Sequence, residues 1–185
     1  MPRLVLRWFL ATACCLSACV PIQISRPVFK VGLLAPFEGQ GRAIGYEALY
    51  AAKLALQERN ASGGLAGWSV ELVALDNANL PHETVRQAQV LAVDPDVMRM
   101  VVVLNLSDVA PTRVLLASFA IPFELVAAEG GASVPAPSPG FVEAYQGISG
   151  GMRPGALAAR TYASVRQMLG LMEGQIRSAG RPRRE

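Results

Sequence analysis

Four short apolar runs alternate with stretches of helical length, and this order constrains the fold more than any other feature. The runs are residues 29–36, 68–76, 98–105 and 121–129. The third run is unbroken from 100 to 104, which is typical of a strand covered on both faces. Strands separated by helices of this length predict right-handed β-α-β units and a parallel sheet.

The stretches between the runs have helical periodicity. Residues 46–60 place Ala48, Ala52 and Ala55 on one side and charged side chains on the other. Residues 81–93 begin with a proline, which suits a first helical turn, and residues 110–120 predict a shorter helix. We therefore predict an α/β fold, three-layer and doubly wound, with a mainly parallel sheet of about four strands. The first strand should be central, between the second and third.

The amino terminus is typical of an export signal. Arg3 and Arg7 precede an apolar stretch, residues 8–18, that is too short to span a bilayer as a stable helix. The stretch ends in Leu16-Ser17-Ala18-Cys19, which resembles the bacterial lipobox, where a peptidase cuts before the cysteine and the thiol carries a diacylglycerol.

This pattern predicts a lipoprotein signal peptide over residues 1–18, lipidation at Cys19 and a tether over 19–27. The protein would be exported, and lipid-anchored to the outer face of the cell membrane or periplasmic. The alternative is a plain secretory signal that is cut elsewhere, with Cys19 incidental. A lipobox cut removes Cys14 and Cys15, so the mature body would have no thiol for a disulfide, a metal or catalysis.

Composition limits the classes of function. Hydrophobic residues make up 52% of the 185-residue chain, which argues against disorder throughout. Arg3 and Arg7 supply two units of the net charge of +3, so the body gives no reason to expect nucleic acid. The basic tail, residues 179–185, is interpreted as solvated, with a binding patch as the alternative.

One further segment carries a resemblance. Residues 29–77 resemble the amino-terminal lobe of type I periplasmic solute-binding proteins, in particular the leucine/branched-chain amino-acid receptors of ABC importers. The resemblance rests on a first loop, a helix end and an acid-amide strand end, which here are Pro36, Gly39, Ala43 and Gly45, then Ala55, Asn60, Gly63, Gly64 and Gly67, then Asp76 and Asn77. The resemblance implies that the longer segment of residues 28–129 forms the amino-terminal lobe.

The resemblance also implies where a solute would bind. In an open α/β sheet, ligands bind at the carboxyl ends of the strands, and the matching residues here are Phe37, Gly39, Asn105 and Ser107. Ser107 is also interpreted as a simple helix cap, and the loop glycines as turn residues without ligand contact. The loop spacing does not fit a dinucleotide-binding G-x-G-x-x-G. Asp108 would repel a carboxylate.

The family's late segment matches residues 141–178, which in the family return to the first lobe after a second lobe. Here only a Gly/Pro/Ser linker, residues 130–140, stands in place of that second lobe. The chain therefore resembles one lobe with its return helices. The stripe Tyr162, Val165, Leu169, Met172 and Ile176 predicts that the last helix has a buried face.

We therefore expect a non-catalytic, exported solute-binding-like protein related to ABC-type branched-chain amino-acid receptors. Its partners would be a weakly bound amino acid or similar solute, an ABC permease, or a second copy bound through an exposed Phe37 at the strand ends. The alternative is a single-lobe interaction module, or a degenerate fragment, that has lost solute binding. No cofactor, metal site or catalytic residue is expected, and the one histidine, His82, should lie solvated in a first helical turn.

Overall fold

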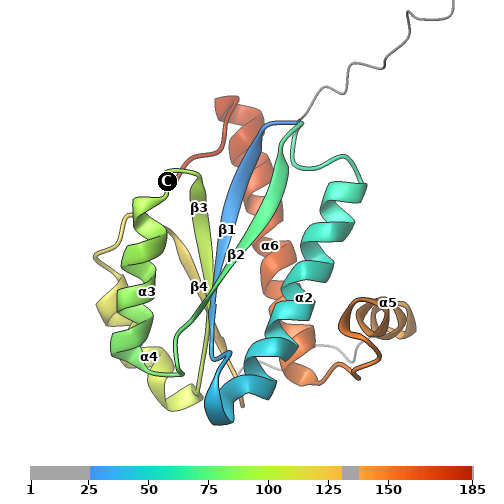
Figure 1. The fold of residues 1–185 in the computed structure, drawn as a ribbon. Helices are drawn as coiled ribbons and strands as arrows, with labels where there is room; N and C mark the ends of the chain where they lie inside the picture. Colours follow the sequence, from blue (N-terminus) through green and yellow to red (C-terminus); the bar gives the residue numbers. More distant parts are fainter. Residues whose placement is uncertain (1–25, 131–137, 185) are drawn as a thin grey trace, which may run out of the picture.

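A four-stranded parallel sheet runs through the middle of the structure (Figure 1). The structure is a computed structural model that describes residues 26–130 and 138–184; Cys19, the predicted signal segment, most of the tether and most of the linker lie outside these residues. The strands are β1 (Val28–Ala35), β2 (Ser69–Asp76), β3 (Val97–Leu104) and β4 (Phe123–Ala127), in the order β2-β1-β3-β4. The predicted central position of the first strand is confirmed.

Helices cover both faces of the sheet, so the predicted three-layer fold is confirmed (Figure 1). The helices α2 (Arg42–Ala61) and α6 (Ala156–Ala179) pack on one face. The helices α3 (Pro81–Val93) and α4 (Leu106–Leu116) pack on the other.

Strand β3 is buried between both helix layers, as its unbroken apolar run predicts. Its residues from Met100 to Leu104 are at most 1% exposed. The last helix also has its predicted buried face, because Val165, Leu169, Met172 and Ile176 all lie in the core, with Tyr162 partly buried.

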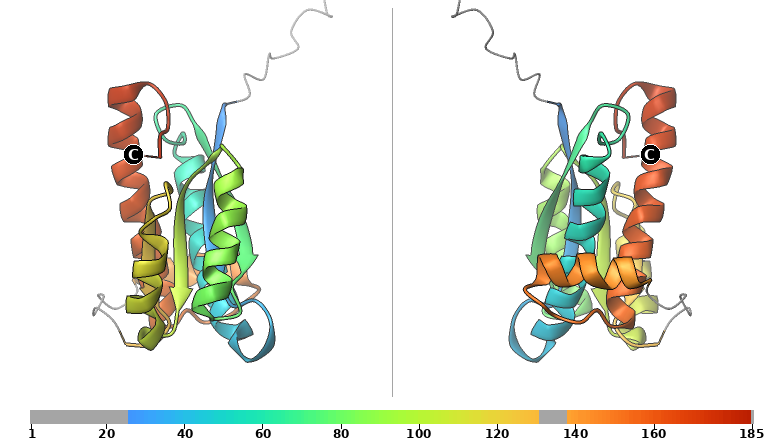
Figure 2. Two further views of the ribbon diagram at one scale, coloured as in Figure 1. Left: turned by 90° about the vertical axis from the view of Figure 1, so that its left-hand side faces the viewer. Right: turned by 90° about the vertical axis from the view of Figure 1, so that its right-hand side faces the viewer.

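Helix α5 (Pro139–Ser149) lies across the outer side of α2 instead of on the sheet (Figure 2). Its Tyr145 is fully buried and donates a hydrogen bond to the carbonyl oxygen of Glu47, at 3.2 Å. Burial raises the pKa of Tyr145 to about 12. The Glu47 carboxylate in turn accepts hydrogen bonds from the backbone amides of Gly155 (3.0 Å) and Ala158 (2.9 Å), at the start of α6.

Several helix starts differ from the sequence prediction. Helix α4 begins at Leu106, directly after β3, and carries Pro111 inside it, whereas the sequence indicated a start near Pro111. Proline has no backbone N–H, so Pro111 leaves one carbonyl oxygen in the first turn of α4 without its helical hydrogen bond. That turn is exposed, and water can donate to this oxygen instead. Helix α5 starts within the predicted linker, where the Ser138 hydroxyl accepts a hydrogen bond from the Phe141 amide, at 3.2 Å.

The basic tail is not wholly solvated, which corrects the prediction for Arg184. Its guanidinium donates hydrogen bonds to the carbonyl oxygens of Val97 (2.8 Å), Ala92 (3.1 Å) and Asp94. Because these carbonyls lie at the turn from α3 into β3, Arg184 fastens the chain end across the amino-terminal end of the sheet.

Candidate functional site

The loop after β1 is shaped by glycines at the carboxyl edge of the sheet. Gly39 has a φ of +62°, in the left-handed region that favours glycine, and it opens a single 3-10 turn, η1 (Gly39–Gly41). A Cβ on Gly45 would overlap the carbonyl oxygen of Pro36, so only glycine lets α2 start this close to the strand end. The loop motif that carries the family resemblance therefore has a structural reason.

Phe37 is half-buried, which corrects the expectation that it would be bare. Its ring packs edge-to-face on Tyr46, with ring centroids 5.9 Å apart. Its backbone amide donates a 2.7 Å hydrogen bond to Oδ1 of Asp76, at the end of β2. The loop is thus fixed at both its side chain and its backbone.

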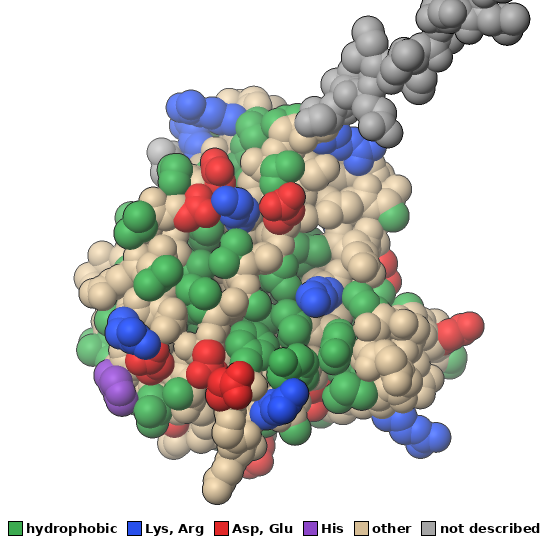
Figure 3. Space-filling view, viewed as in Figure 1, with side chains coloured by type: hydrophobic (Ala, Val, Ile, Leu, Met, Phe, Trp, Pro, Cys, Tyr) green, Lys and Arg blue, Asp and Glu red, His purple; other side chains and the backbone are tan. Residues whose placement is uncertain are grey.

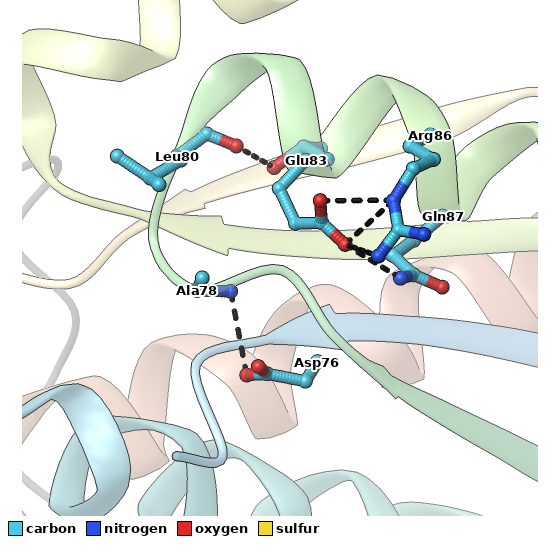
Figure 4. Close-up of polar contacts among 7 residues, drawn as sticks. Asp76, Ala78, Leu80, Glu83, Arg86 and Gln87 are labelled. Atoms are coloured by element: carbon cyan, nitrogen blue, oxygen red, sulfur yellow. Dashed lines mark hydrogen bonds and ion pairs between the residues drawn. The ribbon is translucent and has the colours of Figure 1, made fainter. Parts of the chain in front are cut away.

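The turn after β2 connects the carboxyl ends of three strands. Oδ1 of Asp76 also accepts a hydrogen bond from the Ala78 amide (Figure 4). The buried Asn77 donates from its backbone to the Ala35 carbonyl, at 3.2 Å, and from Nδ2 to the Val103 carbonyl, at 2.9 Å. Oδ1 of Asn79 accepts from the backbone amide of Asn105, at 3.0 Å. This acid-amide turn holds the loops after β1 and β3 in fixed positions.

The loop after β3 leads directly into α4. Asn105 is the N-cap residue, and its side chain makes no capping hydrogen bond. Ser107 is exposed and lies in the first helical turn, so the interpretation of Ser107 as the cap is wrong. Asp108 lies in the same turn. The first turn of α4 therefore carries a hydroxyl and a carboxylate at successive positions, Ser107 and Asp108.

The predicted site residues thus lie on two loops at one edge of the sheet. Phe37 and Gly39 follow β1, Asn105 and Ser107 follow β3, and the turn from Asp76 to Asn79 lies between these strand ends. Asn79 was not predicted, although its place in the Asn-Ala-Asn turn after an acid-ended strand was a signal for such a brace.

A hollow of about 560 Å³ adjoins the first loop on its α2 side. It is lined by Gly39, Gln40, Arg42, Ala43, Tyr46 and Tyr50, together with Met152. The Arg42 guanidinium lies over the Tyr46 ring, 5.3 Å from its centroid, so the wall is aromatic and cationic. Gly39 is the predicted site residue that lines it.

The described residues contain no cluster of histidine, cysteine or acidic side chains that could hold a metal ion. His82 is exposed in the first turn of α3, as expected. Within the same residues, no helix has the length and apolar character needed to cross a membrane.

Comparisons with known proteins agree with this fold. A family model described as "Periplasmic binding protein" matches residues 28–138, more than half of the chain, and ends before the segment predicted to hold the return helices. No curated protein matches the chain.

Parts of the chain are similar to solved structures at low sequence identity. A possible leucine/isoleucine/valine-binding protein from Rhodopirellula baltica is 20% identical, with a TM-score of 0.47, over 53% of this chain and 27% of that one. A branched-chain amino acid transporter substrate binding protein from Streptococcus pneumoniae, in complex with isoleucine, is 24% identical, with a TM-score of 0.46, over 54% and 29%.

A solute binding protein of an ABC transporter from Rhodopseudomonas palustris, in complex with 3,4-dihydroxy benzoic acid, is 21% identical, with a TM-score of 0.46, over 77% of this chain and 45% of that one. The chain spans less than half the length of each of these three proteins. The match of the family model over residues 28–138 shows that the chain belongs to the periplasmic binding protein family.

Proposed function

We propose that this protein is an exported, lipid-anchored and non-catalytic solute-binding-like protein of an ABC-type branched-chain amino-acid uptake system. The observation that carries the proposal is the fixed arrangement of two strand-end loops, in a chain of the periplasmic binding protein family. The acid-amide turn holds both loops at the edge where open α/β sheets bind ligands.

The proposed contacts come from Phe37, Gly39, Asn105 and Ser107. The side chain of Asn105 makes no capping hydrogen bond at the start of α4, where the Asp108 amide donates to the Asn105 carbonyl oxygen at 3.0 Å and the Ser107 hydroxyl lies in the same turn. Amides at a helix start favour an anionic group such as the α-carboxylate of an amino acid. Asp108 opposes that attraction and favours a ligand that also carries an amine.

One lobe supplies only one side of such a site, so the solute stays partly in water. Tight sites bury most of the ligand surface. We therefore propose weak binding of leucine, isoleucine or valine, with a Kd of about 1 mM, which corresponds to about −4 kcal/mol. An importer permease is the proposed membrane partner.

Titration calorimetry of the chain from Val20 to Glu185 with leucine tests this function. We expect millimolar binding that Ser107→Ala weakens severalfold, whereas Ser118→Ala, at an exposed serine just beyond the carboxyl end of α4, leaves it unchanged. The absence of binding heat at about 10 mM leucine, about ten times the expected Kd, would contradict the proposed function. An equal effect of the two serine variants would contradict the proposed site.

A further inference from the structure

Strand β2 is an edge of the sheet, and a side chain partly covers that edge. Both main-chain groups of Val70 bond to the carboxamide of Asn60: its amide donates to Oδ1 at 3.0 Å, and its carbonyl accepts from Nδ2 at 2.8 Å. Asn60 therefore acts as a short substitute for a neighbouring strand at the start of β2.

The rest of this edge has no such cover among the described residues. In a parallel pair, alternate residues direct their main-chain groups to the same side, so Leu72, Ala74 and Asp76 face the way Val70 does, away from β1. β2 carries Glu71 and Asp76, but the four residues between them, Leu72 to Leu75, include no charged residue and no proline. Natural edge strands usually carry such residues to prevent pairing with another chain.

The surface around this edge is apolar. Leu72, Val73 and Leu75 are half-buried, and Ala74 is exposed. Figure 3 shows hydrophobic side chains gathered along the middle of this face, between α3 and α2 where β2 runs. An exposed apolar edge with unused hydrogen-bonding groups is a surface on which another strand can pair.

We propose that the occupant of this edge is the β2 strand of a second copy of this chain, paired antiparallel about a two-fold axis at Ala74. In this register, Ala74 lies opposite Ala74 of the second copy, and Leu72 lies opposite Asp76. All these residues direct their main-chain groups outward, so about six inter-chain hydrogen bonds form. The two four-stranded sheets become one continuous sheet.

Charge and shape favour a second copy over an unrelated strand. A hollow of about 330 Å³ beside β2 is lined by Lys53, Leu72 and Ile148, among others. The register brings the carboxylate of Asp76 from the second copy opposite Leu72, on the side of Lys53, and the symmetry repeats this pair. On the other face, Val73 lies opposite Leu75, which pairs two apolar side chains.

Sedimentation of the chain from Val20 to Glu185 tests the pairing. We expect a dimer that Ala74→Lys or Ala74→Glu each dissociates, raising the Kd about tenfold or more, because like charges meet directly on the axis. Mixing these two variants should restore a dimer. Ala163→Lys, at an exposed alanine of α6, is the matched control and should stay dimeric.

A single cysteine gives an independent readout. The natural cysteines all lie at or before Cys19, so Ala74→Cys introduces the only thiol of this chain. Paired residues on the axis have Cα atoms about 5.5 Å apart, within disulfide range. We expect oxidation to yield a covalent dimer with Ala74→Cys and not with Ala163→Cys.

Thermal melts of every variant confirm that it is folded before its association is compared. A chain that stays monomeric at about 100 μM, far above the Kd of a stable dimer, would overturn the proposal. So would a dimer that both Ala74 charge variants leave intact, since the interface would then lie elsewhere.

Discussion

Glu47 on α2 contacts α5 and the start of α6, which lie 98 to 111 residues later in the sequence. Its backbone carbonyl oxygen accepts a hydrogen bond from the buried hydroxyl of Tyr145 on α5. Its carboxylate accepts hydrogen bonds from two backbone amides at the start of α6. The N-cap of α6 is Gly155, which has no side chain to fill this role. A carboxylate at a helix start is also favoured by the helix dipole.

Glu47→Ala should lower the free energy of unfolding by about 1 kcal/mol, because the α6 amides lose their capping acceptor. Urea unfolding followed by circular dichroism measures this change. Glu143→Ala, at an exposed acid on α5, should change stability by less than half as much. Equal effects of the two variants would show that Glu47 acts only through net charge.

Asp94 gives stability a dependence on pH. Its carboxylate accepts from Lys30 at 2.8 Å and from the Asp96 amide at 2.9 Å, and these bonds lower the pKa of Asp94 below its usual 3.8. The stabilisation is therefore present above this usual pKa and is lost as the pH falls through the lower, folded-state pKa. Asp94→Asn should melt at a lower temperature than wild type at pH 7, and this difference in melting temperature should shrink as the pH falls below 3.8, the usual pKa of the group. Glu143→Gln, as control, should show no such closing gap.

At the scale of elements, β3 is the strand on which the fold depends most. Val102 is fully buried between the two helix layers. Val102→Asp should abolish folding, because a carboxylate there would be buried without a partner. Ala74→Asp, on the exposed edge strand β2, should keep a cooperative melt. Near-UV circular dichroism and thermal melting separate the two outcomes, and a folded Val102→Asp variant would contradict the two-sided burial of β3.

The elements were predictable where a periodic apolar pattern determines them. Helix α3 has its predicted bounds, and β1 lies between β2 and β3 as the doubly wound pattern predicts. The start of α4 was missed because Pro111 is typical of a first turn, while the structure starts the helix at the end of β3. Helix propensity could not indicate this start, because it is fixed by the buried end of β3 and by the hydrogen bond from the Asn105 amide to Oδ1 of Asn79.

The candidate site was predictable only in part. The loops that the glycines and the acid-amide pair marked do lie at the carboxyl ends of the strands, and their role in binding stays a prediction. The half-burial of Phe37 depends on Tyr46, nine positions away on α2, and the path of Arg184 depends on carbonyls about 90 positions earlier. Such long-range contacts have no local pattern in one sequence.

At the scale of the whole molecule, the fold unit begins where the predicted tether ends. The strand β1 starts at Val28, and the family model matches from the same residue. The proposed lipid anchor would join the domain at the amino-terminal ends of the strands, so the strand-end loops proposed to bind solute lie at the opposite end of the sheet (Figure 1).

The proposed anchor makes Cys19 different from its neighbour Cys15. With a lipobox cut, Cys15 leaves with the signal peptide and Cys19 becomes the lipidated first residue. In a bacterial host, we expect wild type and Cys15→Ala in the membrane fraction. Cys19→Ala should lose the anchor, because alanine has no thiol to carry the diacylglyceryl group, and the acyl chains of that group are what would attach the protein to the membrane. Mass spectrometry of the amino-terminal peptide should find a diacylglyceryl group on Cys19 alone, and equal fractionation of the two variants would exclude the lipobox.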